Sequence, residues 1–205
     1  MSDPSAPLNL THHFLIAMPG LEDASSYFSR SVVYLCEHNE RGALGLVINK
    51  PMDINLDGLL QKVDLTLGRQ DLSGAPVFHG GPLQPERGFV LHDAMRPDSA
   101  AEGEAGSPYA STMQIAAGGL EMTTSKDVLE ALSHGAGPRR VLVTLGYASW
   151  GGGQLESELA ENSWLTVQAD PQVIFDAPVP ERYDRALALL GGLQAWMLSS
   201  EAGHA

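Results

Sequence analysis

The sequence predicts an α+β fold, with one domain over residues 10–190 built on a mostly antiparallel or mixed β-sheet and a few flanking helices. Segments rich in β-branched and aromatic residues outnumber segments with helical periodicity. Most of these predicted strands follow one another through short turns, which favours antiparallel neighbours over a doubly wound parallel sheet. With 205 residues and 43% hydrophobic content, the chain is long enough to bury a core without a metal or a disulfide.

The first half of the chain is expected to form five strands and one helix. Residues 1–9 are polar and contain proline, so we expect a flexible N-terminus. The helix should begin after Asn55, a good N-cap residue, because apolar residues follow it at helical spacing. A hairpin should join the second and third strands, and a loop over residues 80–87 should join the last two. The predicted strands are residues 13–18, 31–36, 43–48, 77–79 and 88–91.

The second half begins with an exposed loop over residues 94–110, which lacks apolar periodicity. We expect a hairpin over residues 112–122 and then a helix over residues 126–134, with Ser125 as its N-cap. A buried strand over residues 141–145 should lead into a glycine turn and a short helix. The remaining predicted elements are extended segments at 164–167 and 173–175, a final helix from Pro180 to Leu190, and a helix end and tail over 191–205.

The charge balance argues against direct nucleic-acid binding. The chain has 25 acidic and 12 basic residues, and its formal net charge is −13. Non-specific DNA affinity comes mainly from counterion release by clustered Lys and Arg, whereas the closest basic pair here is Arg139-Arg140. Two roles stay open for this pair, namely pairing with nearby acids or marking a surface for a partner.

The sequence also predicts a cytoplasmic protein. The first seven residues carry no positive side-chain charge, the apolar run at 14–18 is too short for a signal peptide, and no segment is suited to span a bilayer. Cys36 is the only cysteine, so no internal disulfide can form, which agrees with a reducing compartment. The seven histidines show no metal-binding spacing, and we expect no metal ion and no cofactor.

A glycine-rich segment, Gly146-Tyr147-Ala-Ser-Trp150-Gly151-Gly-Gly153, follows the strand at 141–145. Backbone N–H groups ahead of a helix can hold an anion, but no Gly-Lys-Ser/Thr follows as in a P-loop. We favour a structural turn over which Trp150 packs. The alternative is a ligand-binding loop that uses Gly146, Tyr147, Trp150, Gly151 and Gly153.

The segment His79-Gly80-Gly81-Pro82 is a second candidate for ligand binding. A histidine beside two glycines with free N–H groups is typical of oxyanion sites. However, no Gly-x-Ser-x-Gly nucleophile motif accompanies it. A turn histidine bonded to the backbone is therefore favoured over a catalytic base.

Cys36 and His38 form a third candidate, for redox chemistry. If strand alternation continues through Glu37, both side chains share a face, and a charged imidazole would favour the reactive thiolate. The favoured alternative is an inert cysteine in the core.

The glycine-rich segment after the strand at 141–145, the segment His79-Gly80-Gly81-Pro82 and the segment Tyr34-Leu-Cys36-Glu-His38-Asn39 together resemble the YqgE/AlgH family. This is a family of small bacterial intracellular proteins with no settled biochemical activity. The resemblance extends from Leu10 to about Leu190 and implies an α+β fold with a strongly coiled, bifurcated sheet. The chain departs from the family pattern at Ser149, where glycine is usual. One branch of the family is named as a transcriptional regulator.

We therefore expect a protein that binds a partner protein or a small ligand, and not an enzyme. Any effect on transcription should be indirect, because the helix at 126–134 carries one Lys against two acids and does not resemble a recognition helix. The alternative is an enzyme or a thiol-based redox sensor, provided that Cys36, His79 and the loop around Trp150 lie in one cleft.

Overall fold

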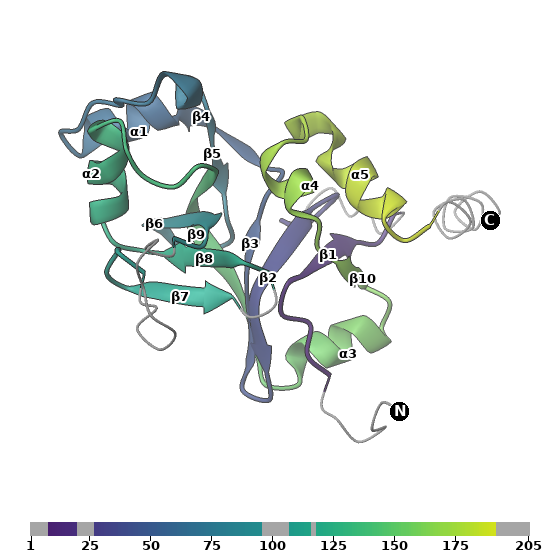
Figure 1. Cartoon of the computed structure of the whole chain (residues 1–205). Helices are drawn as coiled ribbons and strands as arrows, with labels where there is room; N and C mark the ends of the chain where they lie inside the picture. Colours follow the sequence, from purple (N-terminus) through teal and green to yellow (C-terminus); the bar gives the residue numbers. More distant parts are fainter. Residues whose placement is uncertain (1–7, 20–26, 96–106, 116–117, 192–205) are drawn as a thin grey trace.

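The computed structural model describes residues 8–19, 27–95, 107–115 and 118–191, and these residues form an α+β fold around one curled sheet (Figure 1). The strand order is β10-β1-β2-β3-β9-β6-β8-β7, with β4 and β5 as a branch. The strands are β1 (His13–Ala17), β2 (Val32–Asn39), β3 (Gly42–Val47), β4 (Pro51–Asn55), β5 (Pro76–His79), β6 (Leu83–Asp93), β7 (Thr112–Ile115), β8 (Leu120–Thr123), β9 (Val141–Gly151) and β10 (Trp164–Gln168). The α-helices are α1 (Leu56–Lys62), α2 (Asp127–Ser133), α3 (Gln154–Ala160), α4 (Pro171–Phe175) and α5 (Arg182–Ala188).

The sheet divides along β9, the strand that joins its two halves. Near its C-terminal end, Ala148–Gly151 pair antiparallel with β3. Nearer its start, Val143–Leu145 pair in parallel with β5, while the other edge of β9 carries β6. Strands β3 and β5 therefore separate from each other beside β9. The bifurcated sheet implied by the family resemblance is present.

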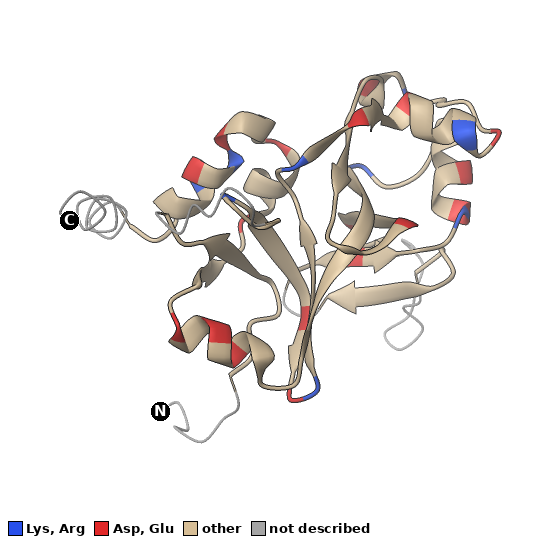
Figure 2. Cartoon of the chain, turned by 180° about the vertical axis from the view of Figure 1, so that it is seen from behind, with Lys and Arg blue, Asp and Glu red and all other residues tan. Residues whose placement is uncertain are grey.

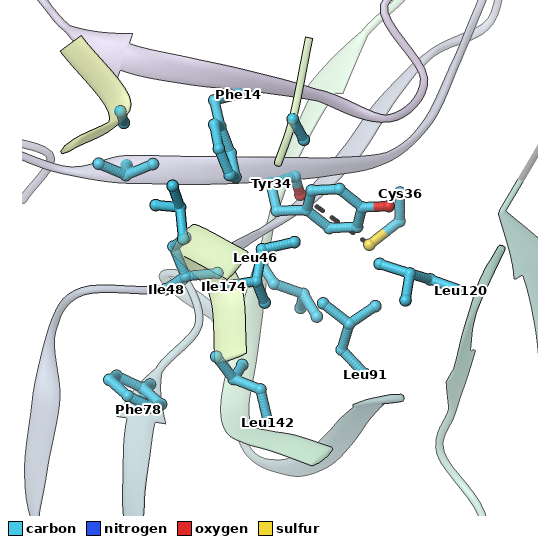
Figure 3. Close-up of a cluster of buried hydrophobic side chains, with 14 of the residues drawn as sticks. Phe14, Tyr34, Cys36, Leu46, Ile48, Phe78, Leu91, Leu120, Leu142 and Ile174 are labelled. Atoms are coloured by element: carbon cyan, nitrogen blue, oxygen red, sulfur yellow. Dashed lines mark hydrogen bonds between the residues drawn. The ribbon is translucent and has the colours of Figure 1, made fainter. Parts of the chain in front are cut away.

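Three apolar clusters fill the space between the sheet and its helices. The largest packs the inner face of β1, β2, β3 and β9 against α4 and α5, and Figure 3 shows Phe14, Tyr34, Leu46 and Ile174 within it. A second cluster packs the opposite face of β1, β2, β3 and β9 against α3. The third lies beneath α1 and α2. Because both faces of the central strands are covered, these strands read as nearly continuous apolar runs.

Several local predictions are confirmed. Strands β2 and β3 form the expected antiparallel hairpin, as do β7 and β8. Asn55 caps α1, because its Oδ1 accepts a hydrogen bond from the Gly58 N–H at 2.9 Å. The predicted strand at 13–18 is β1.

Other predictions were wrong. Strand β9 continues through the expected glycine turn to Gly151, because Gly146 takes a positive φ of 79° and bends the strand without ending it. The expected loop at 80–87 is short, since β6 begins at Leu83. The strand β4 directly after β3 was not predicted.

The helix predictions also need correction. Residues 173–175 lie in α4 and are not extended, because Asp170 caps the Gln172 N–H and Pro171 occupies the first turn. Helix α2 begins at Asp127, and its cap position is Lys126 in place of Ser125. Helix α5 begins at Arg182 and not at the predicted Pro180, after a 3₁₀ turn, Val179–Glu181. The predictions for residues 1–7, 96–106 and 192–205 lie outside the described residues.

Candidate functional site

The segment His79–Pro82 and the glycine-rich segment that begins at Gly146 meet at the point where the sheet divides. The Gly80 N–H donates to the Leu145 carbonyl at 2.9 Å, and the Gly80 carbonyl accepts from the Val47 N–H at 2.8 Å. A Cβ on Gly81 would lie 2.0 Å from the Tyr147 carbonyl carbon, and one on Gly146 would lie 2.6 Å from the Gly81 carbonyl oxygen. These glycines allow two backbones to pack directly against each other, and they leave no room between them for a ligand.

The His79 side chain lies at the surface beside this contact. Its backbone N–H donates to the Lys50 carbonyl at 2.8 Å, and residue 79 is the last residue of β5. Within the described residues its ring makes no hydrogen bond. The geometry gives His79 no partner for acid or base chemistry in that part of the chain.

Trp150 lies near the far end of β9 and holds α3 against the sheet. Its indole N–H donates to Glu158 Oε2 at 2.9 Å, and the Trp164 indole N–H donates to the same oxygen at 2.7 Å. Trp150 is buried, and its ring lies 6.2 Å from that of Phe28. The packed Trp150 expected from the sequence is therefore present, although it packs from a strand and not from a turn.

Cys36 is buried in the largest apolar cluster. Its Sγ lies 3.9 Å from the Tyr34 carbonyl oxygen, and Figure 3 shows it beside the Tyr34 and Leu120 side chains. Burial, and secondarily the charge of Glu37, raises the pKa of the Cys36 thiol above its ordinary value. Both effects disfavour the thiolate.

His38 lies on the other side of the strand from Cys36. The β2–β3 register shifts between Leu35 and Glu37, and this bulge interrupts the alternation that would place residues 36 and 38 on one face. His38 instead contacts the N-terminal segment and α3. Its Nδ1 accepts from the Leu10 N–H at 3.0 Å, so Nε2 carries the proton and donates to Glu156 Oε1 at 2.9 Å.

Beyond the bulge, the three strands β2, β3 and β9 present two rows of residues on one face. The first row is Glu37, Leu44 and Ser149, which are register partners across the strands. The second row is Asn39, Gly42 and Gly151. Gly42 in this row lacks a side chain, and the surface is hollow beside it.

This hairpin-end hollow has a volume of about 250 Å³. It is lined by the first row, by Asn39 and Gly42 of the second row, and by Arg41, Ala43 and Trp150. The Trp150 side chain is bonded to Glu158 of α3, so the backbone of Trp150 forms the wall. A second hollow of about 410 Å³ lies between the N-terminal segment and the same hairpin, and Asn39 and Arg41 border both. The tip of this hairpin carries both basic and acidic colour in Figure 2, whereas α3 carries acidic colour.

The basic residues weighed as a nucleic-acid surface are largely paired. Arg140 Nη2 donates to Asp93 Oδ1 at 2.7 Å, and its Nη1 lies 3.7 Å from Asp176. The Asp93 side chain raises the pKa of Arg140 by accepting its hydrogen bond. Arg139 is exposed, whereas Arg140 is half-buried.

A family model described as AlgH-like (DUF179) matches residues 14–195. The chain belongs to the AlgH-like family. A UPF0301 protein of Acidovorax sp. (strain JS42) is 76% identical over 205 residues, which cover the whole of both chains. The UPF0301 protein of Delftia acidovorans (strain DSM 14801 / SPH-1) is 72% identical and is also covered throughout.

Two solved structures are similar to this AlgH-like chain. The solution structure of the AlgH protein from Pseudomonas aeruginosa matches with a TM-score of 0.71 and 45% identity, over all of both chains. The crystal structure of a protein from Corynebacterium diphtheriae matches with a TM-score of 0.69 and 18% identity, over 97% of this chain and 94% of that chain. The second likeness concerns the fold alone.

Sequence reasoning missed several residues that shape the site of this AlgH-like chain. Arg41 and Glu37 lie between the predicted strands at 31–36 and 43–48 and were given no role, and the hydrogen bond of His38 to Glu156 joins positions 118 residues apart. No helix among the described residues is long and apolar enough to cross a membrane. The same part of the chain contains no cluster of three side chains suited to hold a metal ion.

Proposed function

We propose that this protein acts by binding a small ligand or a protein partner at the hairpin-end hollow, and not by catalysing a reaction. The observation that carries this proposal is a concave surface lined by Gly42, which has no side chain, and by the polar side chains of Glu37, Asn39 and Ser149. Concave sites with a few convergent polar groups are the usual places for ligand binding. One of the sequence-derived candidates, Trp150, lines this hollow.

The chemistry of the remaining candidates supports binding over turnover. Cys36 is buried with a raised thiol pKa, which does not favour a redox sensor. Backbone atoms of neighbouring strands fill the space beside Gly80, Gly81 and Gly146. Neither Cys36 nor His79 is among the residues that line the hollow, so the single cleft required by the enzyme alternative gains no support.

Any role in transcription would be indirect. The net charge of −13 repels a polyanion, and Arg69 and Arg140 are paired with Asp71 and Asp93. A basic stripe that could release counterions from DNA is not found among the described residues. Regulation would therefore proceed through a bound partner or metabolite.

A variant that fills the hollow tests this proposal. Ser149→Trp places a large side chain in the first row, and Ser73→Trp adds the same side chain at an exposed position outside the hollow. Thermal melts of the three proteins across a metabolite panel measure binding, since a ligand at about 100 times its Kd stabilises by about 2.7 kcal/mol. We expect a compound that stabilises the wild type and Ser73→Trp but not Ser149→Trp. Equal stabilisation of all three would place the site elsewhere and contradict the proposal.

A further inference from the structure

We infer that the hairpin-end hollow takes a small zwitterion of the amino-acid class, with its carboxylate held by Arg41 and its ammonium group by Glu37. This inference rests on the proposed function and adds the chemistry of the ligand. Among the described residues that line the hollow, one guanidinium and one carboxylate are the only ionisable side chains. A ligand with one charge of each sign neutralises both, whereas a ligand with a single charge leaves one of them unpaired.

Arg41 is available for this role. Its backbone N–H donates to Asn39 Oδ1 at 2.8 Å, which fixes the turn, but its guanidinium makes no hydrogen bond or ion pair within the described residues. A guanidinium presents paired N–H donors in a planar fork that matches a carboxylate. An unpaired guanidinium beside a hollow favours an anionic group there.

Glu37 is held in place and keeps one oxygen free. Its Oε1 accepts from Asn39 Nδ2 at 2.8 Å, while its Oε2 has no hydrogen-bond partner in the described part of the chain. The bulge between Leu35 and Glu37 turns this carboxylate to the open face. The free oxygen can accept from an ammonium group, and its charge disfavours phosphate and other polyanions.

The size of the hollow sets the size of the ligand. Its volume of about 250 Å³ is below the range of about 300–1,000 Å³ that is usual for drug-sized ligands, so a single amino acid fits better than a nucleotide. Leu44 and Ser149 lie in the same row as Glu37. Leu44 offers an apolar contact and Ser149 offers a hydroxyl, which suits a zwitterion with a short side chain.

The test uses four matched probes with the full-length protein. L-leucine carries both charges, N-acetyl-L-leucine carries only the carboxylate, L-leucinamide carries only the ammonium group, and inorganic phosphate is a plain anion. Binding is measured by isothermal titration and by the amide chemical shifts of Gly42, Leu44 and Ser149. We expect the zwitterion to bind at least 10-fold more tightly than each of the other three probes.

Charge-removing variants complete the test. Arg41→Gln and Glu37→Gln should each weaken L-leucine binding at least 10-fold, whereas the exposed controls Arg139→Gln and Glu130→Gln should leave it unchanged. Equal affinity for a single-charge probe, or insensitivity to both hollow variants, would overturn the inference.

Failure of the inference can be told apart from failure of the proposed function. If no probe shifts the three amides but another metabolite binds in a way that Ser149→Trp abolishes, the zwitterion is wrong and the binding site stands. If no metabolite or partner depends on Ser149, both are wrong.

Discussion

Replacing Gly146 by alanine should destabilise the protein strongly, because it separates the two backbones that meet where the sheet divides. The added Cβ would lie 2.6 Å from the Gly81 carbonyl oxygen and 3.0 Å from the Leu83 carbonyl oxygen. Both are backbone atoms and cannot rotate away. Residue 146 also has a φ of 79°, where a residue with a Cβ is strained.

The two effects can be given approximate magnitudes. Overpacking of this kind costs about 1–3 kcal/mol, and the left-handed conformation costs about 1–2 kcal/mol for a residue with a Cβ. Gly146→Ala should therefore lower the free energy of unfolding by about 2–5 kcal/mol. For a chain of this length, each kcal/mol lowers Tm by about 2–4 °C.

Gly151→Ala is the matched control from the same strand. A Cβ there would meet only Gln154 Oε1, at 3.9 Å, and residue 151 has no positive φ. Its effect should stay within about 0.5 kcal/mol, as for ordinary surface changes. Urea unfolding followed by circular dichroism measures both variants. If Gly146→Ala unfolds like the wild type, or if Gly151→Ala costs as much, the backbone-contact argument is refuted.

Three further predictions concern single groups. Alkylation of Cys36 should be slow in the native protein and fast only after unfolding, because burial raises its thiol pKa. If the native protein is instead alkylated faster than a free thiol, and His38→Ala slows the reaction, the sensor hypothesis is restored. The pKa of Glu156 is lowered, first by a backbone hydrogen bond and then by His38, so its stabilising contribution is complete above its ordinary value of 4.5 and is lost as pH falls through the lower folded pKa. Between pH 2.5 and 7, the Tm of the wild type should accordingly fall more steeply with decreasing pH than the Tm of Glu156→Gln. Parallel dependence of the two Tm values on pH would contradict this assignment. In a mobility-shift titration at physiological salt, the protein should not bind duplex DNA, and salt-sensitive micromolar binding abolished by changing Arg139 and Arg140 to Glu would contradict the indirect role.

Local sequence patterns predicted the parts of the fold that depend on neighbouring residues. The β2–β3 hairpin follows from two apolar runs joined by a short polar turn, and the Asn55 cap follows from a side chain that bonds three residues ahead. Residues 173–175 were wrongly predicted to be extended, because three apolar residues in a row suit either a strand or a buried helix. The decisive signal was the preceding Asp170-Pro171, which starts a helix.

The site was harder to predict because it depends on long-range register. Regular alternation placed Cys36 and His38 on one face, and only the pairing with β3 reveals the bulge at Leu35. The hollow likewise depends on long-range register, because its lining residues Leu44 and Ser149 become register partners although they are 105 residues apart in the chain. No local pattern reports which residues of distant strands will lie side by side.

The shared bond of two indoles to Glu158 gives this protein an optical reporter of its own. Two of its three tryptophans donate to one carboxylate oxygen on α3. Tryptophan emission depends on the polarity and charge around the indole, so detachment of α3 from the sheet would change both signals together. Trp150 also forms part of the hollow wall through its backbone. Events at the hairpin and the docking of α3 can thus be followed by fluorescence without any attached dye.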